Sequence, residues 1–208
     1  MPCCPNKRNR VGLLSTDLLS GLVLIFLGSP AAADSNSVGV SFTTDRDTQE
    51  LSAPKDAKFK VTASHNFDTG VILGASGEYT NTAFSDSATV KIEGTVGYRA
   101  ELGNLIFLTG SAGLGENIQA SGSGDSFPYY VFRIGSDINV TDKVAWNIVT
   151  FRYRDAFDPD NDFLTPQVAT GLSYDFDEHN AISGAVQYNW KNWKPDSVGL
   201  EVGYKYRF

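Results

Sequence analysis

Apolar and polar residues alternate along most of the chain between Asp34 and Phe208. A period of two is the signature of a β-strand with one apolar and one polar face, because successive side chains of a strand point to opposite sides. The last twelve residues show it most strictly, with small or charged residues between the apolar positions Val198, Leu200, Val202, Tyr204, Tyr206 and Phe208. No window in this part of the chain has a sustained helical period, so the pattern predicts an all-β fold.

Ten segments carry this alternation and are separated by polar connections that contain typical turn residues. We expect strands over residues 37–44, 57–67, 71–80, 88–100, 105–114, 129–140, 144–154, 165–176, 181–190 and 197–208. The seventh segment is ambiguous, because residues 144–148 alternate in one phase and residues 149–153 in the other. We predict that the second phase faces outward, since it directs Arg152 and Arg154 to the inside.

The predicted connections also alternate in length. The first, third, fifth, seventh and ninth are the longer ones, and the others are tight turns of a few residues. A meander barrel shows this alternation when both chain ends lie on the same side of a membrane. An even number of strands also closes such a barrel without a free sheet edge, which hydrocarbon does not tolerate. We therefore predict a transmembrane antiparallel up-and-down β-barrel of ten strands, with eight strands as the alternative.

The amino-terminal residues 1–33 have the layout of a secretory signal peptide. A basic region around Lys7, Arg8 and Arg10 precedes an apolar run over residues 18–27, and small residues end at Ala33. The apolar run is about half of the roughly 20 residues that a membrane-spanning helix needs, which argues against a membrane anchor. We expect cleavage before Asp34 and a single barrel domain over residues 34–208.

Removal of this segment would change the composition of the chain. Both cysteines, Cys3 and Cys4, would be lost, so the mature chain would have neither a disulfide nor a thiolate metal site. Residues 34–208 carry 14 Lys plus Arg and 23 Asp plus Glu, a net charge of −9. An acidic chain does not favour nucleic-acid binding, because phosphate neutralisation requires a basic surface.

The carboxyl-terminal pattern Y-x-Y-x-F, formed by Tyr204, Tyr206 and Phe208, resembles the closing strand of bacterial outer-membrane β-barrels. With the alternating segments and the export signal, the chain resembles the small porin-like and OmpA-like transmembrane barrels. The resemblance implies a location in the outer membrane of a Gram-negative bacterium, where the partners are outer-membrane lipid and lipopolysaccharide. It also implies that the terminal strand is the signal read by the barrel-assembly machinery.

Aromatic residues are expected near both ends of the outward faces. Six would lie near the periplasmic ends, at Phe67, Tyr98, Tyr174, Phe176, Tyr206 and Phe208. Five would lie near the outer ends, at Tyr79, Tyr130, Tyr153, Tyr188 and Trp190. Two such girdles are typical of membrane barrels, although aromatic residues are also common in strands generally.

The inward faces are predicted to line the lumen with fourteen charged residues. They are Lys58, Lys60, Glu78, Lys91, Glu93, Arg99, Arg133, Asp137, Arg152, Arg154, Asp175, Glu201, Lys205 and Arg207. Nine are basic and five acidic, so this interior would carry a charge of +4. Charges of both signs could pair into a network that fills the barrel, or they could line a narrow passage that favours anions. Ten strands lie closer in size to the filled barrels of eight strands than to wide porins.

Other candidate chemistry is weak. The acidic stretch from Asp155 to Asp162 contains D-x-D-N-D, but Phe163 stands where a calcium loop needs glycine and Ala169 where it needs glutamate, so no metal or other cofactor is expected. The two histidines, His65 and His179, are expected near the periplasmic end, far from any outer nucleophile.

Three functional hypotheses follow. A structural or surface-interaction barrel with a mostly filled lumen is preferred, and a narrow channel for small, preferentially anionic solutes is the alternative. An outer-membrane hydrolase is weaker still, and no catalytic residue is predicted.

Overall fold

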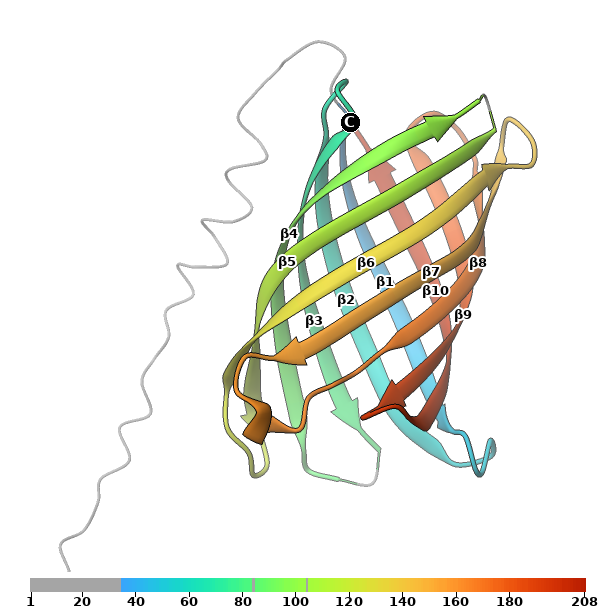
Figure 1. The fold of residues 1–208 in the computed structure, drawn as a ribbon. Coiled ribbons are helices and arrows are strands. Elements are labelled where there is room, and N and C mark those ends of the chain that lie inside the picture. Colours follow the sequence, from blue (N-terminus) through green and yellow to red (C-terminus); the bar gives the residue numbers. More distant parts are fainter. Residues whose placement is uncertain (1–34, 84, 104) are drawn as a thin grey trace, which may run out of the picture.

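The computed structural model describes residues 35–83, 85–103 and 105–208, and the predicted export signal, residues 1–33, lies outside the described residues. The described chain forms one closed wall of tilted strands (Figure 1). The strands are β1 (Ser35–Asp47), β2 (Pro54–Asn66), β3 (Val71–Thr82), β4 (Ala88–Leu102), β5 (Ile106–Ser121), β6 (Phe127–Asn139), β7 (Val144–Ala156), β8 (Gln167–Asp175), β9 (Asn180–Lys191) and β10 (Lys194–Arg207). Each strand pairs antiparallel with its sequence neighbours, and β1 pairs with β10, so the predicted ten-stranded antiparallel barrel is confirmed.

The terminal strand closes the wall against the first one. Ser37 lies opposite Arg207 and Asp47 opposite Ser197, so the pairing runs along nearly the whole of β1. At the rim, the Asn36 amide donates to the Phe208 carbonyl at 3.1 Å and the Phe208 amide donates to the Asn36 carbonyl at 3.0 Å. The last residue therefore takes part in closure, and the start of β1 lies beside the end of β10.

The outer face of the wall is apolar and the interior is polar, which is the reverse of a water-soluble protein. Large apolar side chains are exposed along every strand, whereas the described residues bury eleven polar or charged side chains and only five hydrophobic ones. A continuous apolar outer face of this extent would aggregate in water and is the surface that lipid covers in membrane barrels. The predicted outward positions on β1 and β10, such as Val38, Phe42, Leu200 and Val202, are all exposed.

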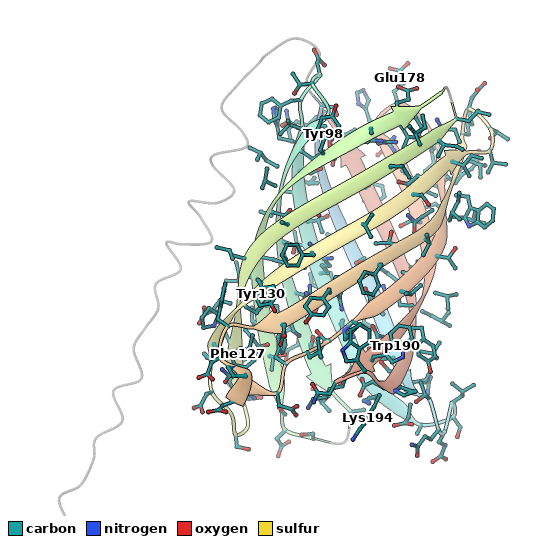
Figure 2. The ribbon with its side chains drawn as sticks, in the orientation of Figure 1. Tyr98, Phe127, Tyr130, Glu178, Trp190 and Lys194 are labelled. Carbon is teal, nitrogen blue, oxygen red and sulfur yellow. The ribbon has the colours of Figure 1, made fainter. Side chains whose placement is uncertain are left out.

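Aromatic side chains gather near both ends of the wall. Figure 2 shows Tyr98 near the end that carries the carboxyl terminus and Tyr130 and Trp190 toward the opposite end. Neighbouring rings contact one another, including Tyr130 with Tyr153 at a centroid distance of 6.1 Å and Tyr188 with Trp190 at 4.5 Å. This arrangement agrees with the two expected girdles.

The ambiguous seventh segment contains a β-bulge. The register between β7 and β8 shifts between Asn147 and Thr150, and the pairing of β6 with β7 shifts at the same place. As a result Trp146, Ile148 and Val149 are all exposed. The choice of one outward phase for the whole segment was therefore wrong for its first half, because a bulge adds a residue and reverses the alternation.

The strands are longer than predicted, which shortens the connections. Strand β5 continues to Ser121, through residues expected to form a loop, and β1 and β2 extend to Asp47 and back to Pro54. The ninth connection is only Asn192 and Trp193, whose φ values of 51° and 61° are those of a tight hairpin turn. The prediction that all odd connections are longer is therefore wrong for the ninth, whereas the seventh, residues 157–166, is the longest.

The seventh connection holds the one helical turn of the described residues, the 3-10 helix η1 (Pro159–Asn161). No helix in the described part of the chain has the length and apolar character needed to cross a membrane.

Candidate functional site: the charged interior

The fourteen predicted lumen residues lie at alternate positions on β2, β3, β4, β6, β7, β8 and β10, on the face opposite the exposed apolar side chains. They divide into two groups by burial. Glu78, Glu93 and Arg154 are buried. Arg99 and Lys205, nearer the rim that carries the carboxyl terminus, are exposed. The interior is thus packed in one part and accessible to water at one end.

Glu93 is the centre of the packed part. Its side chain, on β4, forms ion pairs with Arg133 on β6 and with Arg154 on β7, the latter at 2.9 Å between Nε and Oε2. The Tyr129 hydroxyl donates to the same Oε2 at 3.2 Å. Because β5 and β6 lie between β4 and β7 in the sheet, the contact with Arg154 crosses the interior of the barrel.

Arg154 links Glu93 to a second acid. Its Nη1 lies 3.6 Å from Oε1 of Glu78 on β3, and Lys91 approaches the same oxygen at 3.4 Å. The guanidinium carbon also lies 5.7 Å from the centre of the Tyr129 ring. We call these residues the Glu93 cluster: Glu78, Lys91, Glu93, Tyr129, Arg133 and Arg154.

The centre of the Glu93 cluster is shielded from solvent, whereas the Arg133 side chain is 22% exposed. Glu93 is 3% exposed, Arg154 is 2% exposed and Tyr129 is fully buried. Charges in such surroundings are costly unless they are paired and hydrogen-bonded, and here each acid has at least two cationic partners. The cluster therefore fills the interior at its level.

A network of neutral polar groups lies on the opposite wall and was not predicted. The Gln167 amide donates to Gln187 at 2.6 Å and to Asn189 at 2.7 Å, and Asn189 donates to the Ser197 hydroxyl at 3.0 Å. Gln187 in turn donates to Glu201 at 2.8 Å. The alternation of these uncharged residues with outward apolar residues also indicates an inward position, but the predicted lumen residues were all charged.

Asp45 was missed for a different reason. The sequence predicts that the first strand ends at Thr44, whereas β1 continues through Asp45. Its buried carboxylate pairs with Lys58 and lies opposite Asp56 in the register. Asp45 and Asp56 add acids to the five predicted ones, so the interior charge is less positive than the expected +4.

A cavity of about 330 Å³ lies between the two walls. It reaches from Arg133, a member of the Glu93 cluster, to Lys205 near the rim that carries the carboxyl terminus. Its other charged lining residues are Lys60, Asp137, Arg152 and Glu201. The interior is thus filled at the Glu93 cluster and hollow beside it.

The remaining predicted residues lie near the same rim. Arg207 pairs with Asp175 at 2.9 Å, and the Arg99 guanidinium lies 4.0 Å from the centre of the Phe107 ring. A second cavity of about 490 Å³ lies there and is lined by Arg99, Phe107 and the turn between β2 and β3. Its open, mixed lining offers no set of converging groups.

The histidines and the acidic loop have local contacts. His179 lies in the turn before β9, with Nδ1 2.9 Å from the Arg207 carbonyl, and His65 Nδ1 lies 2.8 Å from the Asn36 side chain. In the seventh connection, hydrogen bonding by the Asn192 amide, with a further contribution from Lys191, lowers the pKa of the Asp162 carboxyl. Within residues 35–83, 85–103 and 105–208, no group of three or more His, Asp or Glu side chains could hold a metal ion.

Comparison with known proteins identifies the architecture only. No protein-family model and no curated protein matches the sequence. An outer membrane channel from Pseudomonas putida F1 is 11% identical, with a TM-score of 0.51 over 86% of this chain and 97% of that chain. The KdgM porin is 17% identical (TM-score 0.44, 82% and 99% covered), and Neisserial surface protein A is 11% identical (TM-score 0.39, 86% and 98% covered). At these identities the likeness shows the fold alone, a closed antiparallel β-barrel like that of the Pseudomonas putida channel.

Proposed function

We propose that the protein is an integral outer-membrane barrel, closed by the Glu93 cluster, that serves envelope structure or surface interaction. The observation that supports this is the set of contacts across the interior from Glu93 to Arg133 and Arg154. Paired charges that are shielded from solvent leave no continuous water path at their level, and a stable network between distant strands also braces the wall.

The membrane location predicts that arginine substitution at two leucines of similar exposure has very different effects on stability. Leu200 is 60% exposed on β10, and Leu51 is 63% exposed in the connection between β1 and β2. Leu200→Arg would place a charge in lipid and should lower the free energy of unfolding in vesicles by about 2–4 kcal/mol, whereas Leu51→Arg should change it by under about 0.5 kcal/mol. Urea unfolding of each variant in lipid vesicles measures both values, and equal effects would contradict the assignment of the lipid-facing wall.

A narrow channel for small anions is the second candidate. It is favoured by the exposed Lys205 and Arg99 at one end and by the excess of inward positive charge. Recordings in planar lipid bilayers separate the two functions. We expect no single-channel steps from the folded protein, because the Glu93 cluster interrupts the path. Anion-selective single-channel steps would contradict the closed-barrel proposal and support the channel.

The remaining proposals concern export and surroundings. Residues 1–33 are proposed to direct export and to be cleaved, and Tyr204, Tyr206 and Phe208 to serve as the signal for the barrel-assembly machinery. The acidic loop between β7 and β8 is proposed to face the lipopolysaccharide layer. A non-enzymatic role agrees with the pairing of the buried Glu78 and Glu93 carboxylates with cations.

A further inference from the structure

The cavity beside the Glu93 cluster has an unusual charge distribution. Of its lining residues, Lys60, Arg133, Arg152 and Lys205 are basic, whereas only Asp137 and Glu201 are acidic. Among the ion pairs of the described residues, none involves Lys60, Arg152 or Lys205. Three cations that form no ion pair therefore line one cavity of about 330 Å³, although Lys60 lies opposite Glu78 in the pairing of β2 with β3.

The two acids of the cavity do not neutralise these cations. Asp137 accepts a hydrogen bond from the Asn147 amide at 2.9 Å. Glu201 accepts one from Gln187 at 2.8 Å and one from Thr43 at 3.2 Å. Both carboxylates thus accept hydrogen bonds from neutral side chains of adjacent strands, and neither forms an ion pair with Lys60, Arg152 or Lys205.

Arg152 carries the clearest sign of a missing partner. It lies directly opposite Arg133 in the pairing of β6 with β7, and like charges at opposed positions destabilise a sheet. Arg133 is paired with Glu93, but the Arg152 Nε is shielded from solvent and has no hydrogen-bond partner among the described residues. A buried guanidinium donor of this kind is costly unless an acceptor meets it.

We propose that this cavity is a binding site for a small oxyanion of the size of inorganic phosphate or a short dicarboxylate. Arg152 and Lys60 hold the anion at the inner end, and Lys205 lies at the approach from the rim that carries the carboxyl terminus. A guanidinium matches the paired oxygens of phosphate and carboxylate groups, and a space of this volume lies at the small end of ligand pockets. The site adds a binding activity to the closed barrel, entered from one side only.

Isothermal titration calorimetry on the folded barrel in detergent tests the site, with inorganic phosphate and succinate as probes and chloride as the buffer anion. We expect saturable binding of one anion per chain. Arg152→Gln should weaken it by at least about tenfold, since a hydrogen bond to a charged group contributes roughly 1.5–3 kcal/mol. Lys143→Gln, which removes the same charge from an exposed turn, should leave the affinity unchanged.

A second variant guards against misfolding of the first. Lys205 is exposed, so Lys205→Gln should not disturb the fold and should also weaken binding. The folded fraction of each variant is read from its migration on unboiled gels. Absence of saturable heat from the folded wild-type barrel would overturn the site, as would equal weakening by Lys143→Gln. Conductance in planar bilayers is recorded separately, because it tests the closed barrel, whereas calorimetry tests the anion site. Failure of one proposal can therefore be distinguished from failure of the other.

Discussion

Replacement of Glu93 by alanine should lower the free energy of unfolding by about 3–5 kcal/mol, which is the usual cost of removing one partner from a buried ion pair. The Arg154 Nε and the Tyr129 hydroxyl would both lose their acceptor in a region closed to solvent. Glu78, whose Oε1 lies 3.6 Å from Arg154, compensates only in part. Urea unfolding in lipid vesicles, followed by the fluorescence of the three tryptophans, measures the loss.

Two further variants make this result specific. Glu101→Ala removes an acid from the same strand and the same face, but at an exposed position, and should change stability by less than about 0.5 kcal/mol. Glu93→Gln keeps an acceptor of similar shape, so its loss of stability should fall between those of Glu93→Ala and Glu101→Ala. If Glu93→Ala were no more damaging than Glu101→Ala, the Glu93 cluster would not brace the barrel.

Replacement of Gly115 by valine should damage the fold strongly, because Gly115 lies on the inner face of β5 against the Tyr129 ring. A Cβ at this position would lie 2.6 Å from the Tyr129 hydroxyl oxygen and 2.8 Å from the Ile92 carbonyl oxygen. The tyrosine ring would have to move, and its hydrogen bond to Glu93 would be lost. Overpacking of this kind costs about 1–3 kcal/mol or more. We expect a lower folded fraction on unboiled gels and reduced stability in urea.

Gly110→Val is the matched control, because it lies on the same strand but a Cβ there meets nothing within 4 Å. It should leave the folded fraction unchanged. Tyr129→Ala provides a second test, since it removes the ring that Gly115 accommodates. Combined with Gly115→Val it should cost less than the sum of the single changes. Additive effects would show that contact with Tyr129 is not the reason for glycine at this position.

The alternation of residues was sufficient to predict the number of strands and most outward faces. Side chains of a strand alternate with a period of two whatever the strand pairs with, so Val38, Val96 or Leu200 could be placed from neighbouring residues alone. Strand ends were less predictable. Asp45 reads as a loop residue, yet it is paired within β1 because β2 and β10 continue beside it.

The bulge in β7 is a second feature that residue alternation could not predict. The two phases of residues 144–153 were visible, but a choice between them assumed an uninterrupted strand. Both phases face outward, on either side of the register shift between Asn147 and Thr150. Whether a strand contains a bulge depends on the register of both neighbours, which is not encoded in the strand alone.

Residue order was enough to predict an all-β chain with one apolar face and a set of inward charges, because both properties depend on local alternation. Which charges meet depends on the closed barrel. Glu93 pairs with Arg133 and Arg154, which are 40 and 61 residues away, while Arg152 has no such partner. Closure of β1 on β10 sets the strand order and the distances across the interior. Those distances separate a filled cluster from the cavity beside it, since an ion pair forms only where two side chains reach each other.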